Sequence, residues 1–256
     1  MTTTDPRGIQ ERRPEPLHPP SHVLAYCAAL ALTAGFVNAV ALLILAVPVG
    51  NLTGVTTQLG MDAANPWRYE SHVLIAILLG FLVGAAVAGA LLASNGAPRR
   101  TRHATVLVIE ALLLFLAAAG VESGPVQAYL AALGIEETAI QALLAAAALG
   151  LQNGLTSSFR GMSVRTTHFT GTVTDLGLML GRSRRHGVDK WKIAILTVTL
   201  LLFLAGGVIG ILTGAQLGGY ALLVPVTICV ALAGVNVAQG RAQVVRIVAA
   251  AVPGAP

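Results

Sequence analysis

The chain has 256 residues, of which 55% are apolar and 11% are charged, and its mean hydropathy is +0.76. Soluble domains carry about a quarter charged residues, so this chain has too few charges to cover a water-facing surface. The composition excludes an ordinary soluble enzyme, a disordered chain and a nucleic-acid binder with an open basic face. It indicates a polytopic membrane protein.

Long apolar runs define the predicted elements in chain order. Residues 1–21 are polar and Pro-rich, which is typical of a disordered tail. Six stretches then reach the length of about 20 residues that crosses a bilayer core, although the fourth is weakened by Gln141, Gln152 and Asn153. The prediction is an all-α membrane protein with six transmembrane helices, at residues 23–47, 72–94, 103–121, 138–158, 191–213 and 218–238.

Basic residues mark one side of this predicted membrane protein. With six crossings, 15 of the 16 Lys and Arg residues fall in the two tails, the 2–3 loop and the 4–5 connection, and only Arg68 falls on the other side. Lys and Arg cluster in cytoplasmic loops, so both termini are expected in the cytoplasm. Residues 1–21 and 239–256 are then cytoplasmic tails, and residues 122–137 form an extracytoplasmic loop.

An internal repeat is the most specific feature of the sequence. Residues 51–60 and 168–177 align at an offset of 117, with Thr, Gly, Thr, Leu and Gly in common. Two further blocks keep the same order at offsets of 115 and 122, namely 35–38 with 150–153 and 81–84 with 203–206.

The repeat predicts two homologous halves, residues 22–121 and 138–238. Each half holds three spans, so the second half must be inverted relative to the first. Inverted repeats recur in secondary transporters, whose binding sites lie near the midplane between the repeats. The Thr-Gly-rich segments are too short to cross a membrane alone, which leaves short re-entrant helices and surface connections as alternatives.

The same motifs resemble a known family. Asn51-Leu-Thr-Gly with Thr56 and Thr57, and Val164-Arg-Thr-Thr-His-Phe-Thr-Gly-Thr-Val-Thr-Asp-Leu-Gly after Leu149-Gly-Leu-Gln-Asn, are similar to those of the YoaK-like family of bacterial integral membrane proteins. The resemblance spans nearly the whole chain apart from the tails. It implies a bacterial cytoplasmic (inner) membrane and supplies no substrate or catalytic residue, because the family is of unknown function.

The repeated segments supply the candidate site. On a helix, residues i, i+3, i+4 and i+7 share a face, which holds Asn51 and Gln58 in one copy and His168 and Asp175 in the other. An intramembrane Asp near a His could relay protons or bind a cation, while free N-terminal amides could meet an anion. The candidate substrate or ion-binding residues are Asn38, Asn51, Thr53, Gly54, Thr57, Gln58, Asn153, Thr167, His168, Thr170, Gly171, Thr174 and Asp175.

A purely structural interpretation competes with this one. Thr and Gly at such spacing also pack membrane helices closely, and Thr hydroxyls satisfy backbone carbonyls. Asp175 could pair with Arg165 or Arg182, and Asn38 and Asn153 are expected to hydrogen-bond the backbone of the neighbouring motif. Glu110 is expected to snorkel toward the basic residues 99–102. Glycine stripes are expected to pack helices, at Gly80 and Gly84 and at Gly206, Gly210 and Gly214.

Two classes of function remain open. The first is a transporter or permease for a small solute, with proton coupling through Asp175 as one option. The alternative is a non-transporting membrane scaffold or regulatory protein. A Walker loop, H-E-x-x-H, G-x-S-x-G and paired cysteines are all missing from the sequence, so we expect no enzyme, no cofactor and no metal site. The expected partners are the lipid bilayer and an unknown small solute, with no nucleic acid. The glycine stripes are equally compatible with a homo-oligomer.

Overall fold

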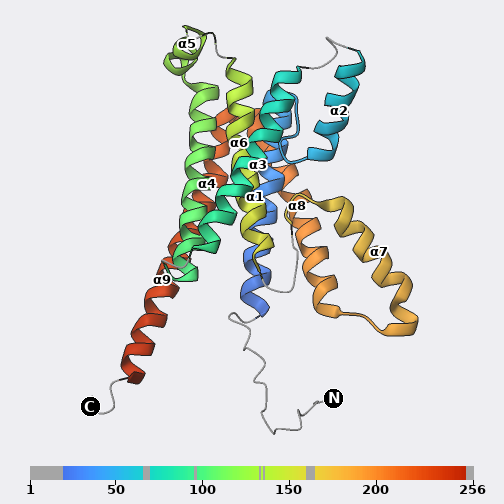
Figure 1. Ribbon diagram of the computed structural model, residues 1–256, viewed down its shortest axis with the longest axis vertical. Helices are drawn as coiled ribbons and strands as arrows, with labels where there is room; N and C mark the ends of the chain where they lie inside the picture. The colour runs from blue at the N-terminus through green and yellow to red at the C-terminus, as the bar shows by residue number, and fades with distance from the viewer. Residues whose placement is uncertain are drawn as a thin grey trace.

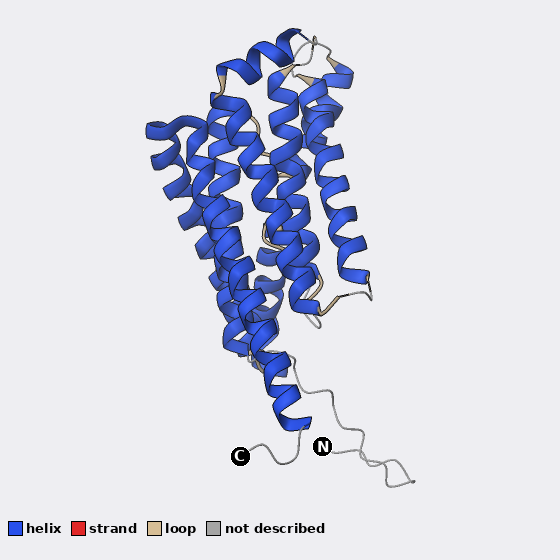
Figure 2. Ribbon diagram, turned by 90° about the vertical axis from the view of Figure 1, so that its left-hand side faces the viewer, coloured by secondary structure: helices blue, strands red, loops and turns tan. Residues whose placement is uncertain are grey.

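A computed structural model of the protein describes residues 20–251 except 66–69, 95–96, 133, 135 and 160–164. The predicted tail up to residue 19, Arg68 and Val164 therefore lie outside the described residues. The described part is helical and contains no strand (Figure 2). Its elements are α1 (Pro20–Leu45), α2 (Leu52–Ala64), α3 (Ser71–Ala93), α4 (Arg99–Glu122), α5 (Gly124–Ala132), α6 (Glu137–Ser157), α7 (Phe169–His186), α8 (Lys190–Leu217), the 3₁₀ helix η1 (Gly218–Leu222) and α9 (Leu223–Ala251).

Five stretches in the described residues are long and apolar enough to cross a membrane. They are Val23–Leu45, Ser71–Ala93, Arg99–Gly120, Glu137–Ser157 and Lys190–Ala242. The first four match four of the predicted spans closely. The fifth has 53 residues and contains α8, η1 and most of α9, so it takes in both of the last two predicted spans.

The long helices run in two opposite directions along one bundle (Figure 1). One apolar cluster joins the ends of α1 and α4 to the beginnings of α3 and α6, through residues such as Val40, Leu114, Ile77 and Ala145. Leu222 of η1 belongs to the same cluster, whereas Ala233 of α9 packs near the beginning of α4. The chain therefore reverses at η1, and α9 runs antiparallel to α4. Gly218, at the start of η1, has a φ of 58°, which glycine adopts without steric cost.

Close glycine contacts join α3 to α6 and α1 to α8. A Cβ added at Gly84 would lie 2.8 Å from the carbonyl carbon of Ala147, and one at Gly206 would lie 2.9 Å from that of Leu32. Real Cβ atoms essentially never approach other atoms closer than 3.0 Å, so only glycine permits these backbones to approach so closely. The prediction that the glycine stripes pack helices is confirmed.

The two glycine interfaces match each other through the repeat. Gly35 approaches the backbone of Phe203, and Gly150 approaches the backbone of Phe81. Gly35 and Gly150 are equivalent at the offset of 115, and Phe81 and Phe203 at 122. The same offsets relate the Gly84–Ala147 contact to the Gly206–Leu32 contact, so repeated sequence blocks make repeated contacts. The helices of each pair run parallel. The contact Gly80–Leu143 is followed further along both helices by Ala88–Gly154, and Leu32–Gly206 is followed by Val40–Gly214.

The Thr-Gly-rich segments form the short helices α2 and α7 on one flank of the bundle (Figure 1). Each begins partway along the bundle, and the two run toward opposite ends. The α2 helix contacts α3, and α7 contacts α8. Their lengths of 13 and 18 residues correspond to about 20 and 27 Å at 1.5 Å per residue, and the shorter falls well below a bilayer core of roughly 30 Å.

Three local features differ from the sequence-based expectations. The helix α5 (Gly124–Ala132) lies within the predicted loop 122–137, and α9 continues to Ala251 through much of the predicted tail 239–256. Glu110 does not snorkel: it is 0% exposed. The reason is that Glu110 lies on the face of α4 that packs inside the bundle, between the buried residues Leu107 and Ala111.

Candidate functional site

A cavity of about 300 Å³ lies between the first turns of α2 and α7 and the helices α3 and α6. It brings together two segments that are separated by more than one hundred residues in the sequence. The lining residues are Gly50, Asn51, Leu52, Thr53, Phe81, Ala85, Asn153, Gly154, Ser157, Arg165, Thr167, His168, Phe169 and Thr170. Six of the predicted site residues are among them: Asn51, Thr53, Asn153, Thr167, His168 and Thr170.

Two asparagines tether the segments that lead into the short helices. The Asn38 Oδ1 accepts a hydrogen bond from the Gly50 backbone N–H at 2.8 Å. The Asn153 Nδ2 donates to Thr167 Oγ1 at 3.0 Å and to the Leu149 carbonyl at 2.8 Å. Asn38 and Asn153 are equivalent in the repeat, as are positions 50 and 167, so equivalent positions are tethered in both halves, although Asn38 accepts its hydrogen bond and Asn153 donates. Asn38 thus binds the backbone that leads into the motif, as expected, whereas Asn153 binds the Thr167 side chain instead of the motif backbone.

The motif glycines allow side chains to fold over the first turn of each short helix. The Asn51 Oδ1 caps α2 by accepting a hydrogen bond from Gly54 N at 3.1 Å, and a Cβ at Gly54 would lie 2.8 Å from Asn51 Nδ2. A Cβ at Gly171 would lie 2.7 Å from the His168 ring. His168, the N-cap residue of α7, makes no side-chain capping hydrogen bond, and the first residues of α7 line the cavity.

The motif threonines divide into two kinds. Thr57 and Thr174 donate to carbonyls of their own helix, at 2.9 and 2.8 Å, as the structural interpretation expects. Thr53 and Thr170 line the cavity, and neither hydroxyl bonds to another group in the described part of the chain. These two threonines are equivalent at the offset of 117, so each half contributes one hydroxyl that is available to a ligand.

The electrostatic character of the cavity is positive. Two helix N-termini converge on it, each with a partial positive charge from aligned peptide dipoles, and Arg165 and His168 also line it. None of the described lining residues is acidic. The buried Asn153, 6% exposed, contributes a carbonyl oxygen without a hydrogen-bond partner. The arrangement therefore offers several hydrogen-bond donors and one unsatisfied acceptor.

The remaining predicted site residues lie outside the cavity lining. Asp175 forms an ion pair with Lys192 on α8 at 3.1 Å, and both side chains are nearly half exposed. The expected partners Arg165 and Arg182 are not the ones it contacts, because α7 packs against α8. The other residues outside the lining are Asn38, Gly54, Thr57, Gln58, Gly171 and Thr174.

Sequence reasoning did not assign several cavity residues to the site. Arg165 was considered only as a partner for Asp175, although it lies three residues before His168 at the entrance to the motif. Phe81 and Ala85 come from α3. Phe81 belongs to the third repeated block, and Ala85 follows that block directly. The signal that could have found them is the repeat itself, because its three blocks meet at this cavity.

One group of side chains has the chemistry of a metal site. Single ligand atoms of Glu70, His72 and Glu136 lie within 4.8 Å of one another, and all three residues are exposed. His72 Nε2 and a Glu136 carboxylate oxygen are in direct contact. Exposed acidic groups of this kind are common without an ion, and the group lies outside the cavity lining.

Long apolar helices packed through glycine contacts define the chain as a helical membrane protein. It belongs to the family described as protein of unknown function (DUF1275), which matches residues 26–235. The YoaK-like family, which the repeated motifs resemble, is part of DUF1275. No match was found among curated proteins or among solved structures.

Proposed function

We propose that the protein is a secondary transporter for a small anionic solute, built from two inverted three-span repeats. The observation that carries the proposal is the cavity between the first turns of α2 and α7, to which equivalent residues of both halves contribute. Transporters with inverted repeats bind substrate at such a junction, where the N-termini of short or broken helices point at anionic groups.

The matched contacts support the inverted repeat. Gly35–Phe203 and Gly150–Phe81 are one contact made twice, with the roles of the two halves exchanged. The helices α8 and α9 have 28 and 29 residues, so each alone exceeds the length of about 20 residues that spans a bilayer. Counting them separately gives six spans, with α1, α4 and α8 in one direction and α3, α6 and α9 in the other.

The charge distribution supports an orientation. The helices α4 and α8 begin at the same end of the bundle. This end carries Arg99, Arg100, Arg102, Lys190 and Lys192. By the positive-inside rule, we assign this basic end to the cytoplasm of a bacterial cell, with both termini on the same side.

The cavity chemistry supports an anionic substrate. The helix N-termini, the Arg165 guanidinium and the hydroxyls of Thr53 and Thr170 all favour negative charge or accepting oxygens. A solute that also carries a hydroxyl or a protonated oxygen would satisfy the free carbonyl oxygen of Asn153. A small carboxylate or oxyanion therefore fits better than a cation.

A proteoliposome assay tests the proposal. Purified protein is assayed for uptake of acetate, phosphate, sulfate and nitrate, with glycerol and tetramethylammonium as neutral and cationic comparisons. A hydrogen bond to a charged group contributes about 1.5–3 kcal/mol. Replacing Thr53 or Thr170 by valine should therefore weaken apparent affinity by about tenfold or more.

The matched control is Thr105→Val. Thr105 is an exposed threonine on α4 whose hydroxyl donates to its own helix at 3.1 Å, so its loss should leave uptake unchanged. Absence of solute-dependent flux across the whole panel would overturn the proposal. Equal effects of Thr53→Val and Thr105→Val would remove the site from this cavity.

A further inference from the structure

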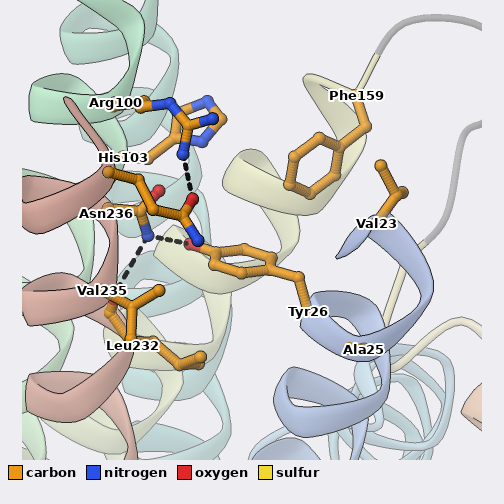
Figure 3. Close-up of a pocket in the computed structure, with 10 residues that line it drawn as sticks. Val23, Ala25, Tyr26, Arg100, His103, Phe159, Leu232, Val235 and Asn236 are labelled. Carbon is orange, nitrogen blue, oxygen red and sulfur yellow. Dashed lines mark hydrogen bonds between the residues drawn. The ribbon is translucent and has the colours of Figure 1, made fainter. Parts of the chain in front are cut away.

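A second cavity, of about 160 Å³, lies at the basic end of the bundle between α1, α4 and α9. Figure 3 shows Tyr26 of α1 and Asn236 of α9 pointing toward each other, with Arg100 and His103 of α4 beside them. Asn236 Nδ2 donates to the Tyr26 hydroxyl at 3.4 Å, and Arg100 donates to Gln239. The cavity therefore has polar side chains along its inner wall within a mostly apolar lining.

Glu110 lies deeper in the bundle than this cavity. It is seven residues beyond His103 on α4, which is about 10 Å along a helix. It is 0% exposed, and neither of its carboxyl oxygens has a hydrogen-bond partner. The Cys229 thiol of α9 lies next to it, and Tyr26 is close enough to interact with it electrostatically. The Tyr26 side chain is thus shared by the cavity lining and the surroundings of Glu110.

The described surroundings of Glu110 offer an ionised carboxylate no cationic partner, only the weakly donating thiol of Cys229. The titratable groups that interact with it are Cys229 on α9 and Tyr26 on α1. The helix α6 carries no titratable residue except Glu137 in its first turn. A buried carboxylate without a cationic partner or hydrogen bonds is strongly disfavoured, and ionisable residues inside membrane proteins commonly mark ion or proton pathways.

We propose that Glu110 is the proton-binding site of the protein, and that protons reach it from the basic end through the cavity lined by Tyr26, His103 and Asn236. Water in the cavity delivers a proton past the Tyr26 hydroxyl to a Glu110 carboxylate oxygen, forming the neutral acid, and Glu110 releases the proton to the opposite side of the membrane when the protein changes its access. This inference rests on the proposed transport function for its purpose, because a proton taken up at Glu110 would couple an anion to a proton gradient. Glu110 takes the coupling role instead of Asp175, which is paired with Lys192.

Infrared spectroscopy of the purified full-length protein tests proton binding without any transport assay. At neutral pH exposed carboxyls are ionised, so a carboxylic acid C=O band should report Glu110. The band should be lost in Glu110→Gln, shifted in Glu110→Asp and retained in Glu136→Gln, which removes an exposed glutamate. In D₂O the wild-type band should shift as the acid proton exchanges, and Tyr26→Phe should slow that shift severalfold. A missing band, or a band that never shifts in D₂O, would overturn the proposal.

Proteoliposomes test the coupling. Glu110→Gln should lose accumulation of solute driven by a pH gradient and retain solute exchange without a gradient, whereas Glu136→Gln should retain both. Full gradient-driven accumulation in Glu110→Gln would refute the coupling role. If the wild-type protein moves no solute, the transport proposal fails while the infrared result still decides whether Glu110 binds an exchangeable proton.

Discussion

Replacing Gly84 by alanine tests the packing of α3 against α6. The added Cβ would lie 2.8 Å from the carbonyl carbon and 3.0 Å from the Cα of Ala147. Ordinary contact begins at 3.4 Å, and the Ala147 carbonyl oxygen lies closer still to the added Cβ, so the two helices must separate by more than about 0.6 Å. A gap of 0.5–1 Å forfeits about a quarter to a half of the dispersion energy of the contacts that it opens, and overpacking of this kind costs about 1–3 kcal/mol.

The expected net effect is smaller than this steric cost. Alanine favours a helix over glycine by about 1 kcal/mol, so Gly84→Ala should destabilise the protein by about 1–2 kcal/mol. Gly89→Ala is the matched control, because Gly89 lies on the same helix and has no atom within 4 Å of an added Cβ. Gly89→Ala should be neutral or stabilising by up to about 1 kcal/mol.

Unfolding in detergent micelles, followed by the helical circular dichroism signal during titration with a denaturing detergent, measures both variants. The midpoint should fall for Gly84→Ala and stay level or rise for Gly89→Ala. Equal midpoints for the two variants would show that α3 and α6 are not held in the close contact described above.

Three further predictions use other parts of the structure. Asn153→Ala should destabilise the protein by about 1–3 kcal/mol in the same unfolding assay. The substitution removes the Asn153 hydrogen bonds to the Leu149 carbonyl and to Thr167, which tether the segment before α7. An unchanged midpoint would contradict the tether. Asp175→Asn should change stability by less than about 1 kcal/mol and leave solute uptake unchanged, since exposed ion pairs such as Asp175–Lys192 contribute little; loss of uptake would return Asp175 to the site. Reporter fusions at Tyr129 and His186 should report opposite sides of the membrane, and the same side for both would refute the inverted repeat.

Much of the helical framework could be predicted from the sequence because continuous apolar runs and their lengths are local properties. The stretches 72–94 and 138–158 agree with α3 and α6 to within one residue at each end. The internal repeat also anticipated which segments would meet, since Thr53 and Thr170 face one cavity.

Features that depend on which helix faces which could not be predicted. Glu110 was expected at the lipid–water interface because only its sequence neighbours were considered, whereas contacts of α4 with α6 and α9 bury it. The pairing of Asp175 with Lys192 depends on α7 folding back onto α8. The short helix α5 was not predicted, because a segment of nine residues with few charges cannot be told from an apolar loop by its sequence.

The parallel pairing of α1 with α8 and of α3 with α6 has a consequence for biogenesis. Within the first half, no described Cα atom of α1 comes within 8 Å of α3 or α4, and α3 packs against α4 only slightly. Each of these helices has its most extensive packing with a helix of the second half, so the first half alone lacks most of its helix packing as it leaves the ribosome. Its glycine-lined faces stay unpaired in the lipid until α6 and α8 have been inserted, and a chain that stops before α8 would leave α1 without its main partner.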